Sequence, residues 1–238
     1  MEAYQLILLT IGAYLLGSIP SSYIAGQLLK GIDIRDYGSG VVSGSNVWHS
    51  VARWAIIPVG IFDVLKGAIP VAIALYVLGF NVWAVGVVGL AAIAGHSWSI
   101  FLGFSGGRGF ATTIGMLLIL APWELLVFIV VALAGWGLLK NSPLAMLIAV
   151  AILPIASFAL ASLDVPGEPL PGELERVWVL VGVLLLLMIK RLLAERPIPA
   201  GNWRRVLVCR LLLDRDTRDR EAWIYRTPSD VEEPPGEK

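Results

Sequence analysis

The sequence predicts an all-α membrane protein, a polytopic bundle of about seven transmembrane helices with its N-terminus outside and its C-terminus inside. Hydrophobic residues make up 57% of the 238 positions and charged residues only 15%, and the mean hydropathy of +0.79 lies outside the usual range of soluble domains. The apolar runs are continuous, whereas the strands of a β-barrel would alternate. The third observation is that basic residues fall in loops on one side.

The individual helices follow from the length of the apolar runs. A hydrocarbon core of about 30 Å needs about 20 helical residues. This length predicts helical segments at 4–29, 54–79, 82–103, 109–121, 123–139, 144–163 and 174–194. The fourth is short, and we expect a half-span or a tilted piece that ends at Pro122. The first is interpreted as a retained span, because it lacks the basic start and the cleavage site of a signal peptide.

The basic residues support this count and the orientation. Loops on the opposite side hold Asn81, Glu124 and the acidic stretch 164–175, and only Arg176 is a basic residue there. Without the short fourth segment, the basic residues would be scattered over both sides, so we retain it. With seven segments and the N-terminus outside, the basic residues on the inner side are Lys30, Arg35, Arg53, Arg108, Lys140, Lys190 and Arg191.

Composition divides the chain into a membrane-embedded domain, residues 1–194, and a polar tail, residues 195–238. The start of the tail interleaves leucine and valine with arginine, which fits a basic amphipathic helix on the inner surface or, equally, a solvated tail with local helix. Residues 228–238 have a disordered composition. The Pro/Gly-rich stretch 164–175 is expected to be an outward-facing connector.

The cysteine content excludes two kinds of structure. Cys209 is the single cysteine, so an intrachain disulfide framework and a thiolate-only metal site are excluded. We expect no metal site.

Three polar stretches interrupt the apolar pattern. The first combines GSIPSS at 17–22 with a Gly/Ser-rich segment at 30–49. Flexible glycine backbone and hydroxyl or amide donors can converge on an anion, although such a segment can also be a plain loop. The spacing matches neither a phosphate-binding P-loop nor a dinucleotide fingerprint. Its candidate anion-binding residues are Gly38, Ser39, Gly40, Ser45 and Asn46.

The second polar stretch lies inside an apolar segment. Asp63 and Lys66 are three residues apart, so they share one helix face and can pair. Ionisable groups inside a span are functional candidates. A structural ion pair that joins the loop to the bundle is the alternative.

The third polar stretch runs from His96 to the turn GGRG at 106–109. A histidine on an apolar face is often a satisfied core residue. Here, however, it is followed by a glycine turn that opens a helix, whose free N–H groups and positive dipole end attract anions. Arg108 adds a planar fork suited to phosphate oxygens. Together the three stretches predict a site where a small phosphorylated solute meets an acyl chain from the bilayer.

The motifs and their order resemble one family, the bacterial membrane glycerol-3-phosphate acyltransferases that use acyl phosphate as donor. The resemblance covers about residues 4–194. The matching motifs are GSIP at 17–20, GIDIRDYGSG at 31–40, Asn46, DVLKG at 63–67, GH at 95–96 and GGRGFAT at 106–112.

The resemblance implies an enzyme of phospholipid biosynthesis in the bacterial plasma (inner) membrane, with its active site facing the cytoplasm. The 1-hydroxyl of sn-glycerol 3-phosphate attacks the acyl carbonyl, phosphate leaves and lysophosphatidic acid forms. No metal, organic cofactor or nucleic acid is implied, whereas membrane lipid and an enzyme that produces acyl phosphate are expected partners. The implied catalytic residues are His96, Arg108 and Ser39, and the implied substrate-binding residues are Gly38, Gly40, Ser45, Asn46, His49, Asp63, Lys66, Gly106, Gly107 and Gly109.

The chain also departs from the family pattern. Val41 replaces an asparagine, His49 falls where an arginine usually lies, Ser99 replaces a proline and Ser105 replaces a lysine, while Pro143 falls near a polar position. Arg108 in place of lysine keeps its charge. Because amide and basic groups of the family pattern are missing, a second interpretation is a catalytically altered or inactive paralogue. Such a protein would bind a phosphorylated lipid precursor or regulate an active enzyme. A transporter of a small phosphorylated solute is a further alternative, although no inverted repeat is evident.

Overall fold

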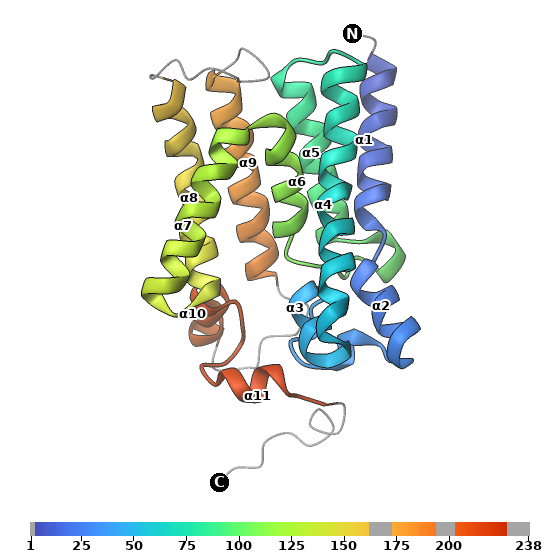
Figure 1. Ribbon diagram of the computed structural model, residues 1–238, viewed down its shortest axis with the longest axis vertical. Helices are drawn as coiled ribbons and strands as arrows, with labels where there is room; N and C mark the ends of the chain where they lie inside the picture. Colours follow the sequence, from blue (N-terminus) through green and yellow to red (C-terminus); the bar gives the residue numbers. More distant parts are fainter. Residues whose placement is uncertain (1–2, 162–172, 194–202, 228–238) are drawn as a thin grey trace.

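The computed structural model describes residues 3–161, 173–193 and 203–227, and this part of the chain is helical without a β-strand. The long helices run side by side along the long axis, with the N-terminus at one end and α10 and α11 at the other (Figure 1). The helices are α1 (Ala3–Ser18), α2 (Ser21–Lys30), α3 (Gly44–Asn46), α4 (Ile56–Ala72), α5 (Val82–Ser97), α6 (Phe110–Leu120), α7 (Pro122–Leu139), α8 (Ser142–Ala161), α9 (Glu173–Leu192), α10 (Trp203–Leu213) and α11 (Arg220–Ile224).

Two of the predicted segments are interrupted. The segment 4–29 is not one helix, because α1 ends at Ser18 and α2 begins at Ser21. Pro20 has no amide hydrogen to continue the helical ladder, so the break belongs to the SIP sequence itself. The segment 82–103 is helical only to Ser97, and a short 3₁₀ turn, Ile100–Leu102, follows it.

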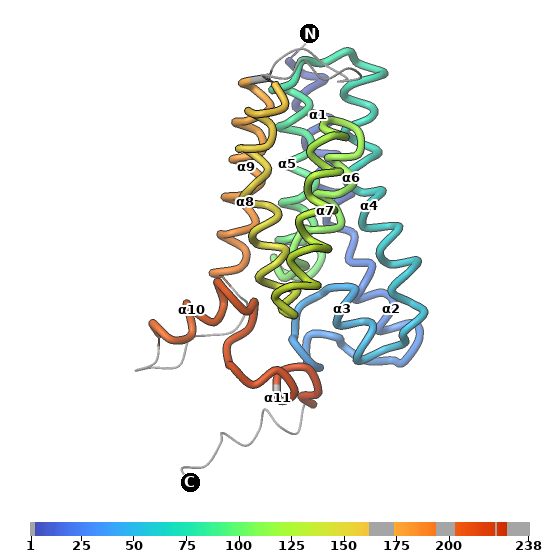
Figure 2. Tube along the Cα trace, turned by 60° about the vertical axis from the view of Figure 1, so that its left-hand side comes forward, coloured from blue at the N-terminus to red at the C-terminus, as the bar shows by residue number. Residues whose placement is uncertain are grey.

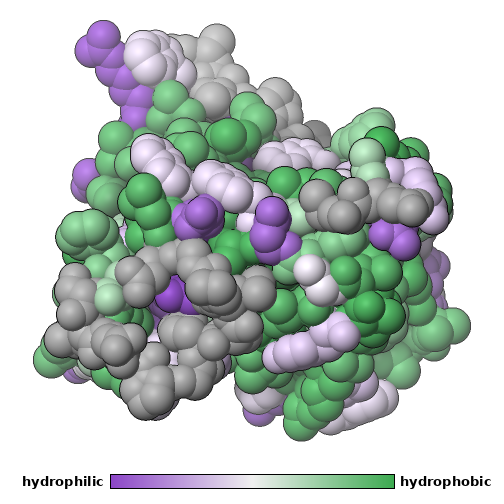
Figure 3. Space-filling model, turned by 90° about the horizontal axis from the view of Figure 1, so that it is seen from above, coloured by the Kyte–Doolittle hydropathy of each residue, from purple (hydrophilic) through white to green (hydrophobic). Residues whose placement is uncertain are grey.

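Four helical segments within the described ranges are long and apolar enough to cross a membrane: Ala3–Lys30, Arg53–Val77, Pro122–Leu139 and Ser142–Ala161. Helices α5 and α6 are apolar but shorter, and α9 carries charges near both ends. The count of seven spans therefore stays a prediction. Hydrophobic side chains dominate the flanks of the molecule when it is viewed from the end that holds the N-terminus (Figure 3), as expected of a surface that meets lipid.

Close helix packing brings the polar motifs together. Gly17 of α1 lies against the backbone of Ala92 in α5, and Gly67 of α4 lies against the carbonyl of Thr112 in α6; a Cβ at either glycine would collide with that backbone. Small residues at helix contacts allow this approach in membrane bundles. The GSIP, DVLKG, GH and GGRG sequences consequently come from helices that touch.

Arg176, the basic residue predicted on the outer side, lies inside the protein. Its side chain is 3% exposed, and its Nε is 3.1 Å from Oε1 of Glu124, which also accepts a hydrogen bond from Ser157 at 2.6 Å. A buried, paired arginine at the helix contact is not a loop charge. It therefore does not weigh against the orientation inferred from the loops.

The tail forms a helix where an amphipathic one is expected, but its buried face differs from a simple apolar stripe. Helix α10 buries Val206, Cys209 and Arg210, whereas Leu212 is exposed. Helices α10 and α11 lie beneath the ends of the long helices (Figure 2). The predicted disordered stretch 228–238 and most of the predicted connector, residues 164–172, lie outside the described residues; the connector's last residues begin α9.

Candidate active site

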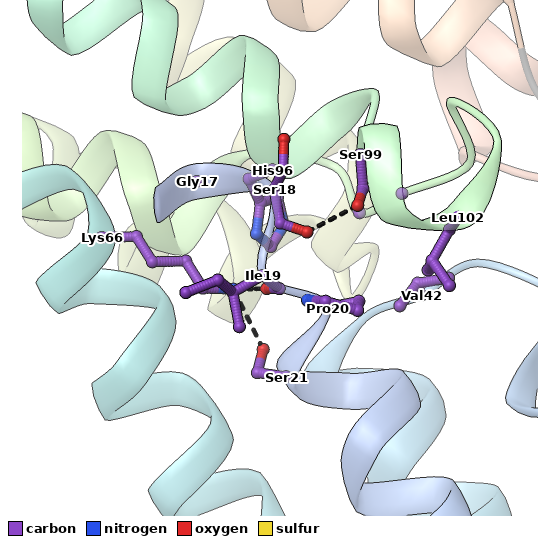
Figure 4. A pocket seen from close by; sticks show the side chains of 12 residues that line it. Gly17, Ser18, Ile19, Pro20, Ser21, Val42, Lys66, His96, Ser99 and Leu102 are labelled. Atoms are coloured by element: carbon purple, nitrogen blue, oxygen red, sulfur yellow. Dashed lines mark hydrogen bonds between the residues drawn. The ribbon is translucent and has the colours of Figure 1, made fainter. Parts of the chain in front are cut away.

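The break between α1 and α2 forms one wall of a small pocket (Figure 4). The opposite wall comes from the end of α5 and from the turn that precedes α6. The lining residues are Gly17, Ser18, Ile19, Pro20, Ser21, Val42, Lys66, His96, Ser99, Leu102, Gly106 and Gly107.

Asp63 is the buried anion at this pocket. Its Oδ1 accepts hydrogen bonds from Lys66 Nζ and from Ser21 Oγ, both at 2.6 Å. Lys66 Nζ also donates to the carbonyl of Ile19 at 2.5 Å, and the same carbonyl accepts from the Ser21 amide at 3.0 Å, within the helix break. The predicted Asp63–Lys66 pair is therefore formed, and it joins α4 to the break in α1 and α2.

His96 lies between this carboxylate and the glycine turn. Its Nδ1 is 3.5 Å from Asp63 Oδ1, and its side chain is 8% exposed. On the other edge of the ring, a Cβ at Gly107 would overlap Nε2, so only glycine fits there. The Gly107 amide donates to the His96 carbonyl at 2.9 Å, which holds the turn against the histidine. Asp63 thus favours a proton on Nδ1 and leaves the lone pair of Nε2 toward the turn.

Two serines complete the pocket. Ser99 replaces the proline of the family pattern, and its hydroxyl donates to the Ser18 carbonyl at 2.5 Å. Within the described residues, the Ser18 hydroxyl is buried and has no hydrogen-bond partner. Ser18 and Ser99 are not among the predicted site residues. The signal that points to them is Pro20, because a helix break exposes the groups beside it.

The loop 38–46 is largely held by its own contacts. The side-chain nitrogen Nδ2 of Asn46 donates to the carbonyls of Ile34, Tyr37 and Val41 at 3.0 to 3.1 Å. Ser39 Oγ accepts from the Val41 amide at 3.3 Å. These groups fix the shape of the loop, and the residue that it contributes to the lining of the pocket is Val42.

The tail contacts the same loop. The Gly38 amide donates to the carbonyl of Arg226 at 2.8 Å, and the Arg226 guanidinium donates back to the Gly38 carbonyl at 3.0 Å. The Gly38 amide is therefore engaged by the tail in this structure. Gly38 and Gly40 have positive φ angles of 54° and 72°, a backbone conformation that favours glycine.

Two predicted binding residues lie at the surface. Ser45 is exposed, with its Oγ 3.1 Å from Ser43 Oγ. His49 is exposed, and its ring meets Tyr225 edge-on at 6.2 Å. Partial desolvation of the imidazole, followed by the charges of Arg220 and Arg53, lowers the pKa of His49 below its usual 6.5. This direction favours the neutral imidazole, whereas the arginine of the family pattern is permanently charged.

Arg108 is not among the residues that line the pocket, and its side chain contacts the tail. Its Nε is 3.0 Å from Oδ1 of Asp214, and its NH1 donates to the Lys190 carbonyl at 3.4 Å. Gly109, with φ of 81°, is the residue before α6. The structure consequently brings His96, Asp63, Lys66, Gly106 and Gly107 together, with Arg108 and Gly109 directly adjacent. No cluster of histidine, cysteine or carboxylate side chains suited to a metal occurs in the described ranges.

Sequence comparison identifies the family. The family model described as glycerol-3-phosphate acyltransferase matches residues 7–195. The chain belongs to this family. A relative from Dehalococcoides mccartyi, glycerol-3-phosphate acyltransferase 5, is 36% identical over 237 residues, which cover 96% of this chain and 97% of the relative. A glycerol-3-phosphate acyltransferase from Parasynechococcus marenigrum is 47% identical over 133 residues, 56% of this chain and 58% of that protein.

Solved structures of the family have the same fold. PlsY, described as an integral membrane glycerol 3-phosphate acyltransferase, superposes with a TM-score of 0.70 in its glycerol 3-phosphate form, at 29% identity over 87% of this chain and 94% of PlsY. Its lysophosphatidic acid form superposes with a TM-score of 0.68. The family resemblance predicted from the motifs is confirmed, and the chain is a multi-pass, all-α membrane protein of this acyltransferase family.

Proposed function

We propose that the chain transfers an acyl group from acyl phosphate to the 1-hydroxyl of sn-glycerol 3-phosphate, giving lysophosphatidic acid and phosphate. Family membership supplies the reaction class, glycerol-3-phosphate acyl transfer. The acyl phosphate donor, the residue roles, the inner-membrane location and the cytoplasmic side of the site are our proposal. So are the division at residue 194 and a partner enzyme that supplies acyl phosphate.

The observation that carries the proposal is the placement of His96 between a buried carboxylate and the pocket. With Nδ1 beside Asp63, Nε2 is the basic atom, and it lies at the Gly107 edge of the site. A histidine oriented by a carboxylate is a common general base. Nε2 takes the proton of the 1-hydroxyl while the hydroxyl oxygen attacks the acyl carbonyl carbon.

Collapse of the tetrahedral intermediate breaks the bond between the acyl carbon and the phosphate oxygen. Phosphate leaves with the electron pair, so the site must neutralise anionic charge. Arg108 and the turn Gly106–Gly109 at the start of α6 supply a cation and a helix N-terminus for this purpose. Lys66 pairs with Asp63, and Asn46 holds the shape of the loop that includes Gly38, Ser39 and Gly40.

The turn beside the pocket provides a route for the acyl chain. Leu102 lines the pocket, while Ile100, Phe101 and Phe104 on the same turn are 48%, 60% and 59% exposed. Exposed aromatic and aliphatic side chains on a short turn are typical of a segment that lies in the membrane interface. We infer that the acyl chain enters here from the bilayer.

The charged ends of the helices support a seven-span topology with the N-terminus out. Lys30 ends α2, Arg53 precedes α4, Lys140 follows α7 and Arg191 lies at the end of α9. These helix ends face the end of the molecule that bears α10 and α11 (Figure 1). By the positive-inside rule, that end faces the cytoplasm.

The test is product formation by purified protein in lipid vesicles supplied with palmitoyl phosphate, with and without sn-glycerol 3-phosphate. Mass spectrometry should detect lysophosphatidic acid acylated at position 1 only when both substrates are present. Saturable binding of glycerol 3-phosphate without phosphate release would instead favour the altered paralogue. Accumulation of unmodified glycerol 3-phosphate inside the vesicles would favour a transporter.

A further inference from the structure

Two buried arginines share one carboxylate at the cytoplasmic end of α9. Oδ1 of Asp214 lies 3.0 Å from Nε of Arg108 and 3.6 Å from Nε of Arg191. The two arginine side chains are 11% and 4% exposed, and the aspartate side chain is 18% exposed. This cluster joins the turn before α6, the end of α9 and the tail.

The charges of the cluster do not balance. Among the described residues, two guanidinium groups face one carboxylate, which leaves about one positive charge in a largely buried place. A phosphate monoester carries about −1.5 to −2 charges near neutral pH and would balance both arginines. Guanidinium groups also match the geometry of phosphate oxygens better than an ammonium group does. The cluster is thus suited to a phosphate more than to a single carboxylate.

The cluster adjoins the pocket along the chain. Arg108 follows Gly107, the residue that packs against Nε2 of His96. The cluster therefore borders the turn whose glycines line the pocket.

Arg191 is held in place by other contacts. Its NH1 donates to the Leu211 carbonyl at 2.7 Å and its NH2 donates to the Pro143 carbonyl at 3.0 Å. These bonds hold two of the three guanidinium nitrogens and leave Nε toward the carboxylate. The arginine stays oriented whether Asp214 or another anion occupies that position.

Asp214 lies at a position in the tail from which its carboxylate can leave the two arginines. It follows the end of α10 and has a positive φ of 56°, at the start of the loop before α11. The neighbouring Arg210 holds the tail separately, through Asp216 at 2.5 Å and through the Leu192 carbonyl at 3.2 Å. Release of Asp214 from the arginines therefore leaves the tail docked.

We infer that Arg108 and Arg191 form one phosphate subsite, and that Asp214 is an internal carboxylate which the substrate phosphate displaces on binding. The inference rests on the proposed function, because it assigns the subsite to the same reaction. An internal competitor multiplies the apparent affinity by the fraction of molecules in which it leaves the site free. Asp214 accordingly sets the apparent affinity for the phosphorylated substrate.

The test is the variant Asp214→Asn in the full chain, with Asp219→Asn as the control. Both changes remove one negative charge from the tail, but Asp219 is exposed and only the first change frees Arg108 and Arg191. We expect Asp214→Asn to lower the KM for glycerol 3-phosphate roughly threefold to tenfold, and Asp219→Asn to leave it within about twofold. An unchanged or raised KM in Asp214→Asn would overturn the inference and make Asp214 a group that merely positions Arg108.

A binding experiment tests this inference independently of the proposed reaction. Isothermal calorimetry with inorganic phosphate should show tighter binding to Asp214→Asn and weaker binding to Arg191→Lys, which keeps the charge but loses the fork, whether or not the protein turns over. This pattern without acyl transfer would defeat the proposed function and leave the subsite standing. Acyl transfer with equal phosphate binding by all variants would defeat the subsite alone.

Discussion

At the scale of single residues, the proposed chemistry depends on one buried carboxylate. Asp63 contacts Lys66, Ser21 and His96 through the same oxygen. Its charge both balances the buried lysine and fixes the proton of the histidine on Nδ1. Loss of that charge should therefore affect catalysis more than loss of any one hydrogen bond to it.

Asp63→Asn tests this role against Ser21→Ala, which removes one hydrogen bond to the same carboxylate. We expect Asp63→Asn to reduce kcat by about 10²- to 10⁴-fold, because the base loses its orientation. Ser21→Ala should cost about 1 kcal/mol of stability and change kcat only a few-fold. The measurement is steady-state kinetics on monodisperse protein, with thermal unfolding in parallel. Equal effects of the two variants on kcat would contradict the role of Asp63 as the orienting group.

His49 provides a prediction about pH. Its pKa is lowered by partial desolvation and by Arg220 and Arg53, so the folded state favours the neutral imidazole. The associated stability is complete above the unfolded pKa near 6.5 and is lost as the pH falls through the folded pKa. NMR of labelled histidine should show His49 titrating below pH 6.5, and Arg220→Gln should move that pKa upward. Arg218→Gln, which changes an exposed arginine in the same tail, is the control; an equal response to both changes would contradict the assignment.

The sequence predicts part of the site at this scale. Asp63, Lys66, His96 and the glycines of the turn meet as their motifs indicate, because each motif lies at a helix contact. Asp214 could not have been assigned, since an aspartate in a charge-rich tail has no local pattern that marks its contact with Arg108. The engagement of Gly38 by Arg226 was hidden for the same reason.

At the scale of elements, the apolar runs locate the helices well and their interruptions poorly. Segments 54–79, 109–121 and 123–139 agree with the helices within a few residues, because a hydrophobic run of fixed length suffices to define them. The break at Pro20 was missed because the run remains apolar across it. That break shapes the proposed site, since it presents the Ile19 carbonyl, which also accepts from the Ser21 amide, to Lys66 and the Ser18 carbonyl to Ser99.

The pair of Glu124 and Arg176 is an element-scale contact between α7 and α9, with Ser157 of α8 as a third member. Glu124→Gln removes the carboxylate charge beside the buried Arg176 guanidinium, and we expect it to reduce stability by about 3–5 kcal/mol. The rate per folded molecule should not change, since these residues do not line the pocket. Thermal unfolding in detergent, with the exposed Asp36→Asn as control, measures the loss. A variant as stable as the control would show that the pair contributes nothing.

At the scale of the whole molecule, the proposed topology rests on the side at which the basic residues gather. A cysteine-labelling experiment in a Cys209→Ser background tests it. Asn81→Cys, before α5, should react with an impermeant maleimide from outside the cell, whereas Lys140→Cys, after α7, should react only in inverted vesicles; both positions are exposed in the structure. Labelling of both from the same side would contradict the alternating arrangement.

The central claim is that the pocket around His96 performs acyl transfer despite the changes at Val41, His49, Ser99 and Ser105. The most direct measurement is phosphate release from palmitoyl phosphate by wild-type protein and by His96→Ala in lipid, with and without glycerol 3-phosphate. We predict release that depends on the acceptor in the wild type and falls by about 10²-fold or more in the variant, with the fold intact. Release by folded His96→Ala at the wild-type rate, or no release by the folded wild type, would contradict the account.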